Sequence, residues 1–313
     1  MMAIVKRYGT PLIFAILVFL MIAELSSICR RKGKTWDFTS GFWAEPENSL
    51  DLVCIGSSHS YCSWNPNVAK AEGGFDSYSF GSPSQPIEAS YAFIREVFRH
   101  QRPKVILLET FAMIAADPDR PIARLAAHNA TDQFDFGRAK TELIDSMNLA
   151  EGRENYYFDL LQYHSRWKEL SKTDFTTVRA RQENRGYQAL KSVVPIKYIY
   201  WEADKIAWDA GINGHLAMWL DRIQRYVEAQ GSELVVFTAP YNMNLPNRRF
   251  VKALTRFFKN RGIRYYNLAD KALGLEMDGD KDFYDDKDGH LNVYGAEKMT
   301  RFLAKRLVAD GVL

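Results

Sequence analysis

Side chains that could support nucleophilic chemistry follow an apolar, strand-like stretch early in the chain. In "DLVCIGSSHSYCSWNP", residues 51–66, the apolar residues end at Gly56, and Ser57, Ser58 and His59 follow at once. A serine at the end of a buried strand can act as a nucleophile if a general base and an orienting acid reach it. The same residue types are also typical of an ordinary turn. This stretch alone leaves both interpretations open.

A histidine with nearby carboxylates comes much later in the chain. The segment "DFYDDKDGH" ends at His290, shortly before an amphipathic helix, and carries Asp285, Asp286 and Asp288. An imidazole base oriented by a carboxylate would complete a Ser-His-Asp arrangement. The Asp-rich run 278–288 lacks the regular spacing and terminal Glu of a calcium-binding loop, so we expect no metal there.

The spacing of apolar residues predicts how these two segments meet. Short apolar runs alternate with amphipathic helical patterns, which is typical of a parallel sheet with helices on both faces. The carboxyl ends of parallel strands lie at one edge of the sheet, so the serines and His290 are expected to converge there. The expected strands are 52–55, 78–80, 105–109, 234–239 and 263–268, and the expected helices are 88–98, 215–231, 248–262 and 294–309.

A long stretch interrupts this alternation. Residues from about 112 to 212 contain helical and irregular sequence without a clear strand. Because this stretch is too long for a loop without structure of its own, we interpret it as a helical insertion between the third and fourth strands. The expected organisation is a membrane anchor at 1–34, an interfacial stalk at 35–50 and one catalytic domain at 51–313.

The N-terminal region has the composition of a membrane-spanning helix. Leu12–Ile28 comprises 17 residues, and those up to Ala23 are all apolar, which is the low end of what crosses a bilayer. A cleavable signal peptide is the alternative, but no typical cleavage site follows, so we expect an uncleaved anchor. Four aromatic residues beyond it are expected at the membrane–water interface or, alternatively, packed on the domain: Trp36, Phe38, Phe42 and Trp43.

Composition argues against several classes of function. A formal net charge of +3 in 313 residues gives no basis for nucleic-acid binding. The three cysteines, Cys29, Cys54 and Cys62, have no metal-binding or redox spacing, and no glycine-rich phosphate loop is present. We expect Cys54 to be buried in its strand, with a Cys54–Cys62 disulfide as the alternative. We expect no cofactor.

Taken together, the motifs resemble those of the SGNH/GDSL hydrolase superfamily. The resemblance is carried by "IGSSHSYCSWNP", "SFGSPSQPIE", "YHSRW" and "DGHLNVYGAEK", and it covers most of residues 50–313. More narrowly, the chain is similar to membrane-anchored bacterial members found with cell-surface polymer modification. These include the protein that acts in D-alanylation of teichoic acid and, more distantly, the alginate O-acetyltransferases. The resemblance implies a three-layer, flavodoxin-like α/β fold.

The resemblance also implies roles for individual residues. Ser58 matches the nucleophile and His290 the base, while the backbone N–H groups of Ser58 and Gly81 match the oxyanion hole. The family's Gly-x-Asn-Asp after the third strand is absent, and "LLETF" stands in its place. Asn242, after the fourth strand, is the candidate to replace the missing donor.

The acid is less directly matched. Lys287 stands where many relatives carry it, three residues before the histidine. Asp-x-His occurs among the alginate-type members, and the single glycine between Asp288 and His290 allows a tight turn. We therefore expect Asp288 to orient His290, with Asp285 and Asp286 farther away.

Three further side chains are candidates for substrate binding: His59, His164 and Arg166. His59 is also typical of a turn residue or of a residue that supports the site from behind. His164 and Arg166 could bind an acidic group of a substrate or, alternatively, hold the insertion to the core.

The resemblance implies a membrane-anchored serine O-acyltransferase that modifies a cell-surface polysaccharide or a teichoic-acid-like polymer. It also implies a membrane-bound O-acyltransferase as partner. A carbohydrate O-acyl esterase and a catalytically silent scaffold subunit are the alternatives.

We expect the anchor in the bacterial cytoplasmic membrane and the domain on its extracytoplasmic face. The count of basic residues favours the opposite orientation, because four follow the anchor and two precede it. On the outer face those four residues would instead contact anionic lipid head groups. They are Arg30, Arg31, Lys32 and Lys34, and the two before the anchor are Lys6 and Arg7.

Overall fold

Five parallel strands form one sheet at the centre of the protein. The computed structural model describes residues 2–30, 39–175, 179–198, 201–207, 209 and 211–313. The strands lie in the order β2-β1-β3-β4-β5. All five predicted strands are confirmed to within one residue at either end. Their bounds are Leu52–Gly56 (β1), Ser77–Gly81 (β2), Val105–Glu109 (β3), Glu233–Thr238 (β4) and Arg264–Asn267 (β5).

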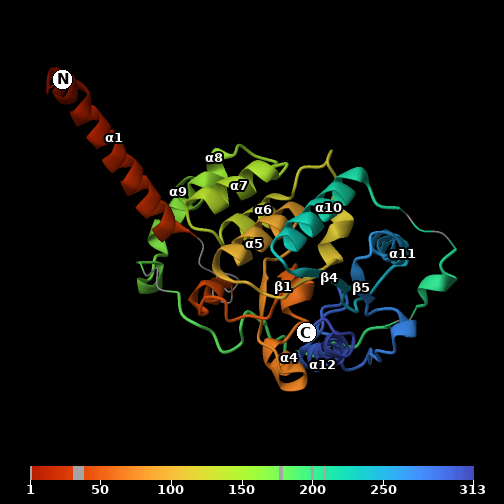
Figure 1. Cartoon of the computed structure of the whole chain (residues 1–313). Helices are drawn as coiled ribbons and strands as arrows, with labels where there is room; N and C mark the ends of the chain where they lie inside the picture. The colour runs from red at the N-terminus through yellow and green to blue at the C-terminus, as the bar shows by residue number, and fades with distance from the viewer. Residues whose placement is uncertain (1, 31–38, 176–178, 199–200, 208, 210) are drawn as a thin grey trace.

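Helices cover both faces of this sheet (Figure 1). Because successive strand residues point to opposite faces, Val53 and Ile55 pack in one apolar cluster, and Leu52 and Cys54 pack in another. Helices α5 and α10 belong to the first cluster, and α4 and α12 to the second. The four predicted helices are confirmed, and α4 is additional. The bounds are Pro66–Gly73 (α4), Ile87–His100 (α5), Gly214–Ala229 (α10), Leu245–Asn260 (α11) and Val293–Ala309 (α12).

The stretch between β3 and α10 is built from short helices. The helix α7 packs against α5, and the ring of Phe134 meets Phe93 of α5 edge-on at 5.0 Å between centroids. This stretch therefore shares the core of the sheet domain, and we refer to it as the insertion. Its elements are η2 (Phe111–Ala115), α6 (Arg124–Thr131), α7 (Arg138–Ser146), α8 (Glu154–Tyr157), α9 (Asp159–Tyr163), η3 (His164–Lys168), η4 (Lys172–Phe175) and η5 (Ala203–Lys205).

The aromatic residues just before β1 pack on the domain. Phe42, in the short helix η1 (Gly41–Ala44), is fully buried and stacks on Phe80 with 4.2 Å between ring centroids. Trp43 donates its indole N–H to Glu96, and the guanidinium of Arg179 lies 3.9 Å from its ring centroid. The structure therefore favours the alternative in which Phe42 and Trp43 pack on the domain. Trp36 and Phe38 lie outside the described residues.

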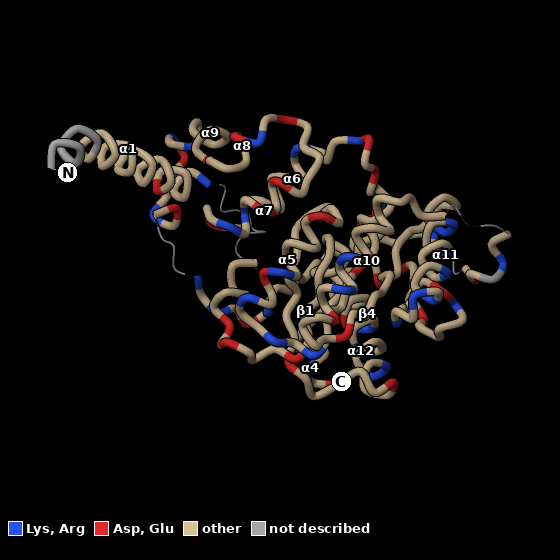
Figure 2. The backbone as a smooth tube through the Cα atoms, turned by 45° about the horizontal axis from the view of Figure 1, so that its top comes forward, with Lys and Arg blue, Asp and Glu red and all other residues tan. Residues whose placement is uncertain are grey.

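The first helix, α1 (Met2–Cys29), projects from this body (Figures 1 and 2). Its segment Gly9–Cys29 has 21 residues with a mean hydropathy of 2.5 and is mostly exposed. At 1.5 Å per residue this segment is about 31 Å long, which matches the hydrocarbon thickness of a bilayer. By length and composition, α1 can span a membrane.

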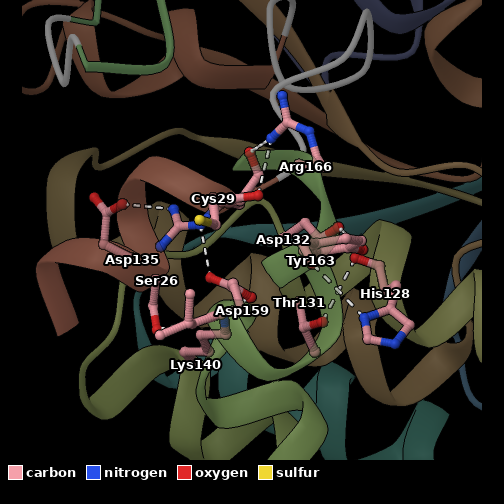
Figure 3. Close-up of polar contacts among 12 residues, drawn as sticks. Ser26, Cys29, His128, Thr131, Asp132, Asp135, Lys140, Asp159, Tyr163 and Arg166 are labelled. Atoms are coloured by element: carbon pink, nitrogen blue, oxygen red, sulfur yellow. Dashed lines mark hydrogen bonds and ion pairs between the residues drawn. The ribbon is translucent and has the colours of Figure 1, made fainter. Parts of the chain in front are cut away.

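Buried charges fix the end of α1 to the insertion (Figure 3). Arg30 is buried and donates to Asp159 at 2.9 Å and to Asp135 at 2.7 Å. The ammonium of Lys140, also fully buried, lies 2.6 Å from the other carboxylate oxygen of Asp159. The prediction that Arg30 faces lipid head groups is therefore wrong, because the carboxylates of the insertion take it inward. Arg31, Lys32 and Lys34 lie outside the described residues.

Arg166 completes this junction. One guanidinium nitrogen of Arg166 donates to the carbonyl oxygens of Cys29 and Arg30. Carbonyls at the end of a helix have no N–H partner within the helix, so this contact satisfies them. The other terminal nitrogen pairs with Asp174 at 2.9 Å. The hydroxyl of Ser26 accepts the backbone N–H of Leu160 at 3.3 Å. The insertion thus holds the last turn of α1 through both charge and backbone contacts.

Substitution of the two carboxylates that pair with Arg30 should lower the stability of the protein by very different amounts. Asp159→Asn leaves the buried Lys140 without its ion-pair partner and leaves Arg30 with Asp135 alone, so it should lower the free energy of unfolding by about 3–5 kcal/mol. Asp135→Asn is the matched control, because the Asp135 side chain is 65 % exposed and its loss should cost less than about 1 kcal/mol. Urea unfolding of the full chain in detergent micelles measures both. Equal losses in the two variants would contradict this role of Asp159.

Candidate active site

The turn after β1 presents Ser58 at the carboxyl edge of the sheet. Helix α3 (Ser58–Tyr61) begins directly after this turn, with Ser57 as its N-cap. The Ser57 hydroxyl accepts the backbone N–H of His59 at 3.3 Å, and the Ser60 hydroxyl donates to the Ser57 carbonyl at 2.8 Å. Ser57, His59 and Ser60 are buried, whereas Ser58 is partly exposed. The chain therefore turns from strand to helix in one residue and leaves the Ser58 hydroxyl accessible.

His290 connects this hydroxyl to a carboxylate. Its Nε2 lies 2.8 Å from the Ser58 Oγ, and its Nδ1 lies 2.6 Å from an oxygen of Asp285. These are hydrogen-bond distances for a nucleophile, a base and an orienting acid. The expectation that Asp288 orients the imidazole is wrong, because Asp285 occupies that position.

The reason lies in the turn before His290. The carboxylate of Asp285 also accepts the backbone N–H groups of Asp288, Gly289 and His290, at 2.8, 2.9 and 3.3 Å. Gly289 has φ +70°, and a Cβ there would lie 2.5 Å from the backbone nitrogen of Asn242. Asp285 thus both closes the turn and meets the imidazole that the turn presents.

Asn292, two residues after His290, fixes the same segment from the other side. Its carboxamide nitrogen donates to the carbonyls of Lys281 and Phe283, at 2.7 and 3.0 Å. Its carboxamide oxygen caps the start of α12 by accepting the N–H groups of Tyr294 and Gly295. His290 is therefore held between a carboxylate-closed turn and a capped helix.

The charge state of Asp285 suits an orienting acid. Burial alone would raise its pKa, but hydrogen bonds from the Asp288 N–H, from His290 and from the Gly289 N–H hold the pKa below its ordinary value. The carboxylate therefore stays ionised, and it would stabilise an imidazolium at His290 when the serine proton is transferred.

His59 supports the site from behind. Burial holds its pKa well below the ordinary value, so the ring is neutral, and its Nε2 lies 3.2 Å from the Asp288 carbonyl. A carbonyl only accepts, so this nitrogen carries the proton. The ring stacks on Phe111 with 3.5 Å between centroids and lies 4.2 Å from the His290 ring. His59 thus joins the nucleophile turn to the turn that carries the base, and its buried position does not suit the predicted contact with substrate.

Glu109, at the end of β3, contacts the nucleophile turn from the neighbouring strand. Its carboxylate accepts the Ser57 hydroxyl at 3.0 Å and the Phe111 N–H at 2.6 Å. Complete burial raises the pKa of Glu109 to about 7, although these hydrogen bonds oppose the shift. The contact bridges β1 and β3, between which the strand order reverses, and this is where parallel sheets bind ligands. Glu109 is the last residue of the predicted strand 105–109, and its place in the sequence gives it no evident role.

The two other predicted oxyanion donors lie at the same edge of the sheet. Gly81 is paired with Gly56, and a Cβ at Gly81 would lie 2.1 Å from the Gly56 carbonyl oxygen, so only glycine fits this approach. The carboxamide of Asn242 donates to the Asp286 carbonyl at 3.2 Å, which ties the loop after β4 to the turn before His290. Oxyanion stabilisation by Ser58, Gly81 and Asn242 stays a prediction.

The remaining candidates lie elsewhere. Arg166 binds the end of α1 and Asp174, so the structure favours the alternative in which it holds the insertion. His164 is exposed and its Nδ1 meets the Leu161 carbonyl at 3.1 Å, within the same part of the insertion. Cys54 and Cys62 are buried free thiols. The part of the chain that the structure describes contains no cluster of metal-ligating side chains.

A scan against protein-family models and a search of curated proteins give no match for this chain. We therefore interpret the site from its own geometry.

The assignment of Asp285 predicts a large loss of serine reactivity on substitution. Asp285→Asn should slow the reaction of Ser58 with a fluorophosphonate by about 10³–10⁴-fold, because the imidazole loses its orientation and its counter-charge. Asp288→Asn should have a small effect, since the backbone groups that the turn uses are unchanged. Inactivation rates of the two purified variants compare them directly. A larger loss in Asp288→Asn than in Asp285→Asn would refute the assignment.

The buried carboxyl of Glu109 predicts an unusual dependence of stability on pH. Its pKa rises on folding from 4.5 to about 7, so the folded state binds more protons and this group's contribution to stability falls as pH rises through that range. Glu109→Gln does not titrate. The stability of this variant relative to the native protein should therefore increase between pH 5 and 8, by about 3 kcal/mol at most. Denaturant unfolding at several pH values measures the difference, and parallel curves would argue against a protonated Glu109.

Proposed function

We propose that this protein is an SGNH-type serine O-acyltransferase, anchored to a membrane by α1, that modifies a hydroxyl-bearing polymer of the cell envelope. The observation that carries the proposal is the hydrogen-bonded series from Ser58 through His290 to Asp285. The strand order β2-β1-β3-β4-β5 also supports it, because this is the order of flavodoxin-like three-layer folds.

The first half-reaction acylates the serine. His290 Nε2 takes the proton of the Ser58 hydroxyl as the oxygen attacks the acyl carbonyl, and Asp285 stabilises the imidazolium that forms. Backbone N–H groups at the carboxyl edge of the sheet are the candidates to bind the oxyanion. The leaving group then departs with the proton from His290, which leaves an acyl-Ser58 ester.

The second half-reaction transfers the acyl group. His290, neutral again, takes a proton from a hydroxyl of the polymer, whose oxygen attacks the acyl-Ser58 carbonyl. The tetrahedral intermediate collapses, and His290 returns the proton to the Ser58 oxygen. Water in place of the polymer hydroxyl gives an esterase with the same residues. Hydrolysis and transfer thus differ only in which acceptor reaches the ester.

Membrane attachment favours transfer over hydrolysis. α1 is long and apolar enough to span a bilayer, and the buried ion pairs at its end hold the domain in one position relative to it. A fixed position beside the membrane suits an enzyme that receives acyl groups from a membrane-bound O-acyltransferase. We place the domain on the extracytoplasmic face of a bacterial cytoplasmic membrane, where envelope polymers are modified.

A chromogenic ester tests this proposal without knowledge of the natural donor. The full chain in detergent should release p-nitrophenolate from p-nitrophenyl acetate, and Ser58→Ala should reduce that release at least about 10³-fold because the acyl acceptor is gone. Ser49→Ala is the matched control, because Ser49 is exposed and precedes the opposite end of β1. Added glycerol or methyl glycosides should be acetylated in competition with water.

The outcomes of this experiment separate the alternatives. Acetylated glycerol or glycoside supports transfer, and acetate as the sole product would show an esterase. Full activity in Ser58→Ala would overturn the proposal, because the reaction would then not depend on Ser58. No activity in the native chain together with an unreactive Ser58 would also overturn it and would favour a catalytically silent scaffold.

A further inference from the structure

The insertion covers α1 well inside its apolar segment. The ring of Phe19 meets Phe136 edge-on at 5.6 Å and Phe158 at 6.3 Å between centroids. Phe136 and Phe158 also stack on each other at 5.5 Å. Phe19 lies midway along the segment Gly9–Cys29 that can span a membrane. The two insertion residues therefore sit beside a part of α1 that would lie in lipid.

The uncovered part of the apolar segment Gly9–Cys29 is too short to cross a bilayer by itself. The 11 residues from Gly9 to Phe19 rise about 16 Å, whereas a bilayer's hydrocarbon core is about 30 Å thick. Glu24 is the first acidic residue after the apolar run and is exposed. From Phe19 to Glu24 the helix advances by five residues and rises about 7.5 Å, which is within the depth to which interfacial elements enter the acyl-chain boundary.

The surface around this contact has the side chains of a membrane interface. Leu161 of α9 is 51 % exposed and Phe136 is 40 % exposed, although both are apolar. Trp167 in η3 is 66 % exposed, and the ammonium of Lys168 lies 5.3 Å from its ring. Exposed tryptophan and lysine are typical of the level of lipid head groups. Both α9 and η3 pack against α1, and Figure 2 shows α9 beside the base of α1.

Several of the charged side chains beside this contact are paired. Asp135, next to Phe136, pairs with Arg30 at 2.7 Å and with Arg179 at 2.6 Å. Arg166 and Asp174 pair with each other at 2.9 Å. Paired charges lower the cost of bringing this surface to the edge of the hydrocarbon.

We propose that the insertion enters the outer part of the bilayer that α1 crosses, with Phe136, Phe158 and Leu161 at the acyl-chain boundary and Trp167 among the head groups. The inference rests on the proposed membrane anchoring and adds a second, monotopic contact to it. The free part of the apolar segment of α1 does not span the whole bilayer. The apolar face of the insertion contacts the lipid over the remaining depth. The domain is consequently held against the membrane by one fixed face.

Site-specific fluorescence in vesicles tests this contact. Phe136→Cys and Leu161→Cys are each labelled with a nitrobenzoxadiazole probe, because the native thiols Cys29, Cys54 and Cys62 are buried. The full chain is reconstituted into phosphatidylcholine–phosphatidylglycerol vesicles with or without bromine on the acyl chains. Leu17→Cys in α1 is the positive control. Val308→Cys, exposed on α12, is the negative control, and the unmodified chain reports background labelling.

Bromolipid should quench the labels at positions 136 and 161 at least roughly half as strongly as the label at position 17, and should leave the label at position 308 unchanged. If bromolipid quenches the label at position 17 but aqueous iodide quenches the labels at positions 136 and 161, this inference is overturned and the anchor stands. Labels shielded from iodide but not quenched by bromolipid would indicate a protein contact and also overturn it. No quenching at position 17 would refute the membrane anchor itself, whereas the acyl-transfer chemistry is tested separately by Ser58→Ala.

Discussion

The carboxylate of Asp285 is the group on which the site depends. One side chain accepts three backbone N–H groups and also meets the imidazole of His290. Each such hydrogen bond to a charged group contributes about 1.5–3 kcal/mol, so the turn and the orientation of the base are stabilised together. The same contacts keep the carboxylate ionised. A local structural need and a chemical need are thus met by one residue.

The remaining contacts bring two distant parts of the chain to the same edge of the sheet. His59 reaches the Asp288 carbonyl, and the hydroxyl of Thr300 in α12 donates to the Ser63 carbonyl and accepts the Asn65 N–H. Each of these hydrogen bonds joins the segment after β1 to the C-terminal segment, more than 200 residues away. Because β1 and β3 are adjacent, Glu109 can hold Ser57 as well. The parallel sheet therefore brings the segments that carry Ser58 and His290 together, and the local turns fix the final distance between the two side chains.

The sequence predicted what depends on periodicity and missed what depends on tertiary contacts. Continuous apolar runs such as "VILLE" predicted the strands, and their parallel order placed Ser58 and His290 at one edge. Asp285 could not be chosen over Asp288, because spacing does not show which carboxylate folds back onto the ring. Arg30 and Phe42 were expected near lipid because each follows the anchor, yet buried partners far along the chain hold them inside. Helix α4 was missed although Asn65, Pro66 and Gly74 are ordinary capping residues.

The proposed chemistry requires that Ser58 is a nucleophile activated by His290. Peptide mapping by mass spectrometry after treatment with a fluorophosphonate tests it most directly, because the adduct identifies the serine that reacted. We expect one adduct, on Ser58, that is absent when His290→Ala is treated in the same way. An adduct on Ser57 or Ser60, or an adduct on Ser58 that persists without the imidazole, would contradict it.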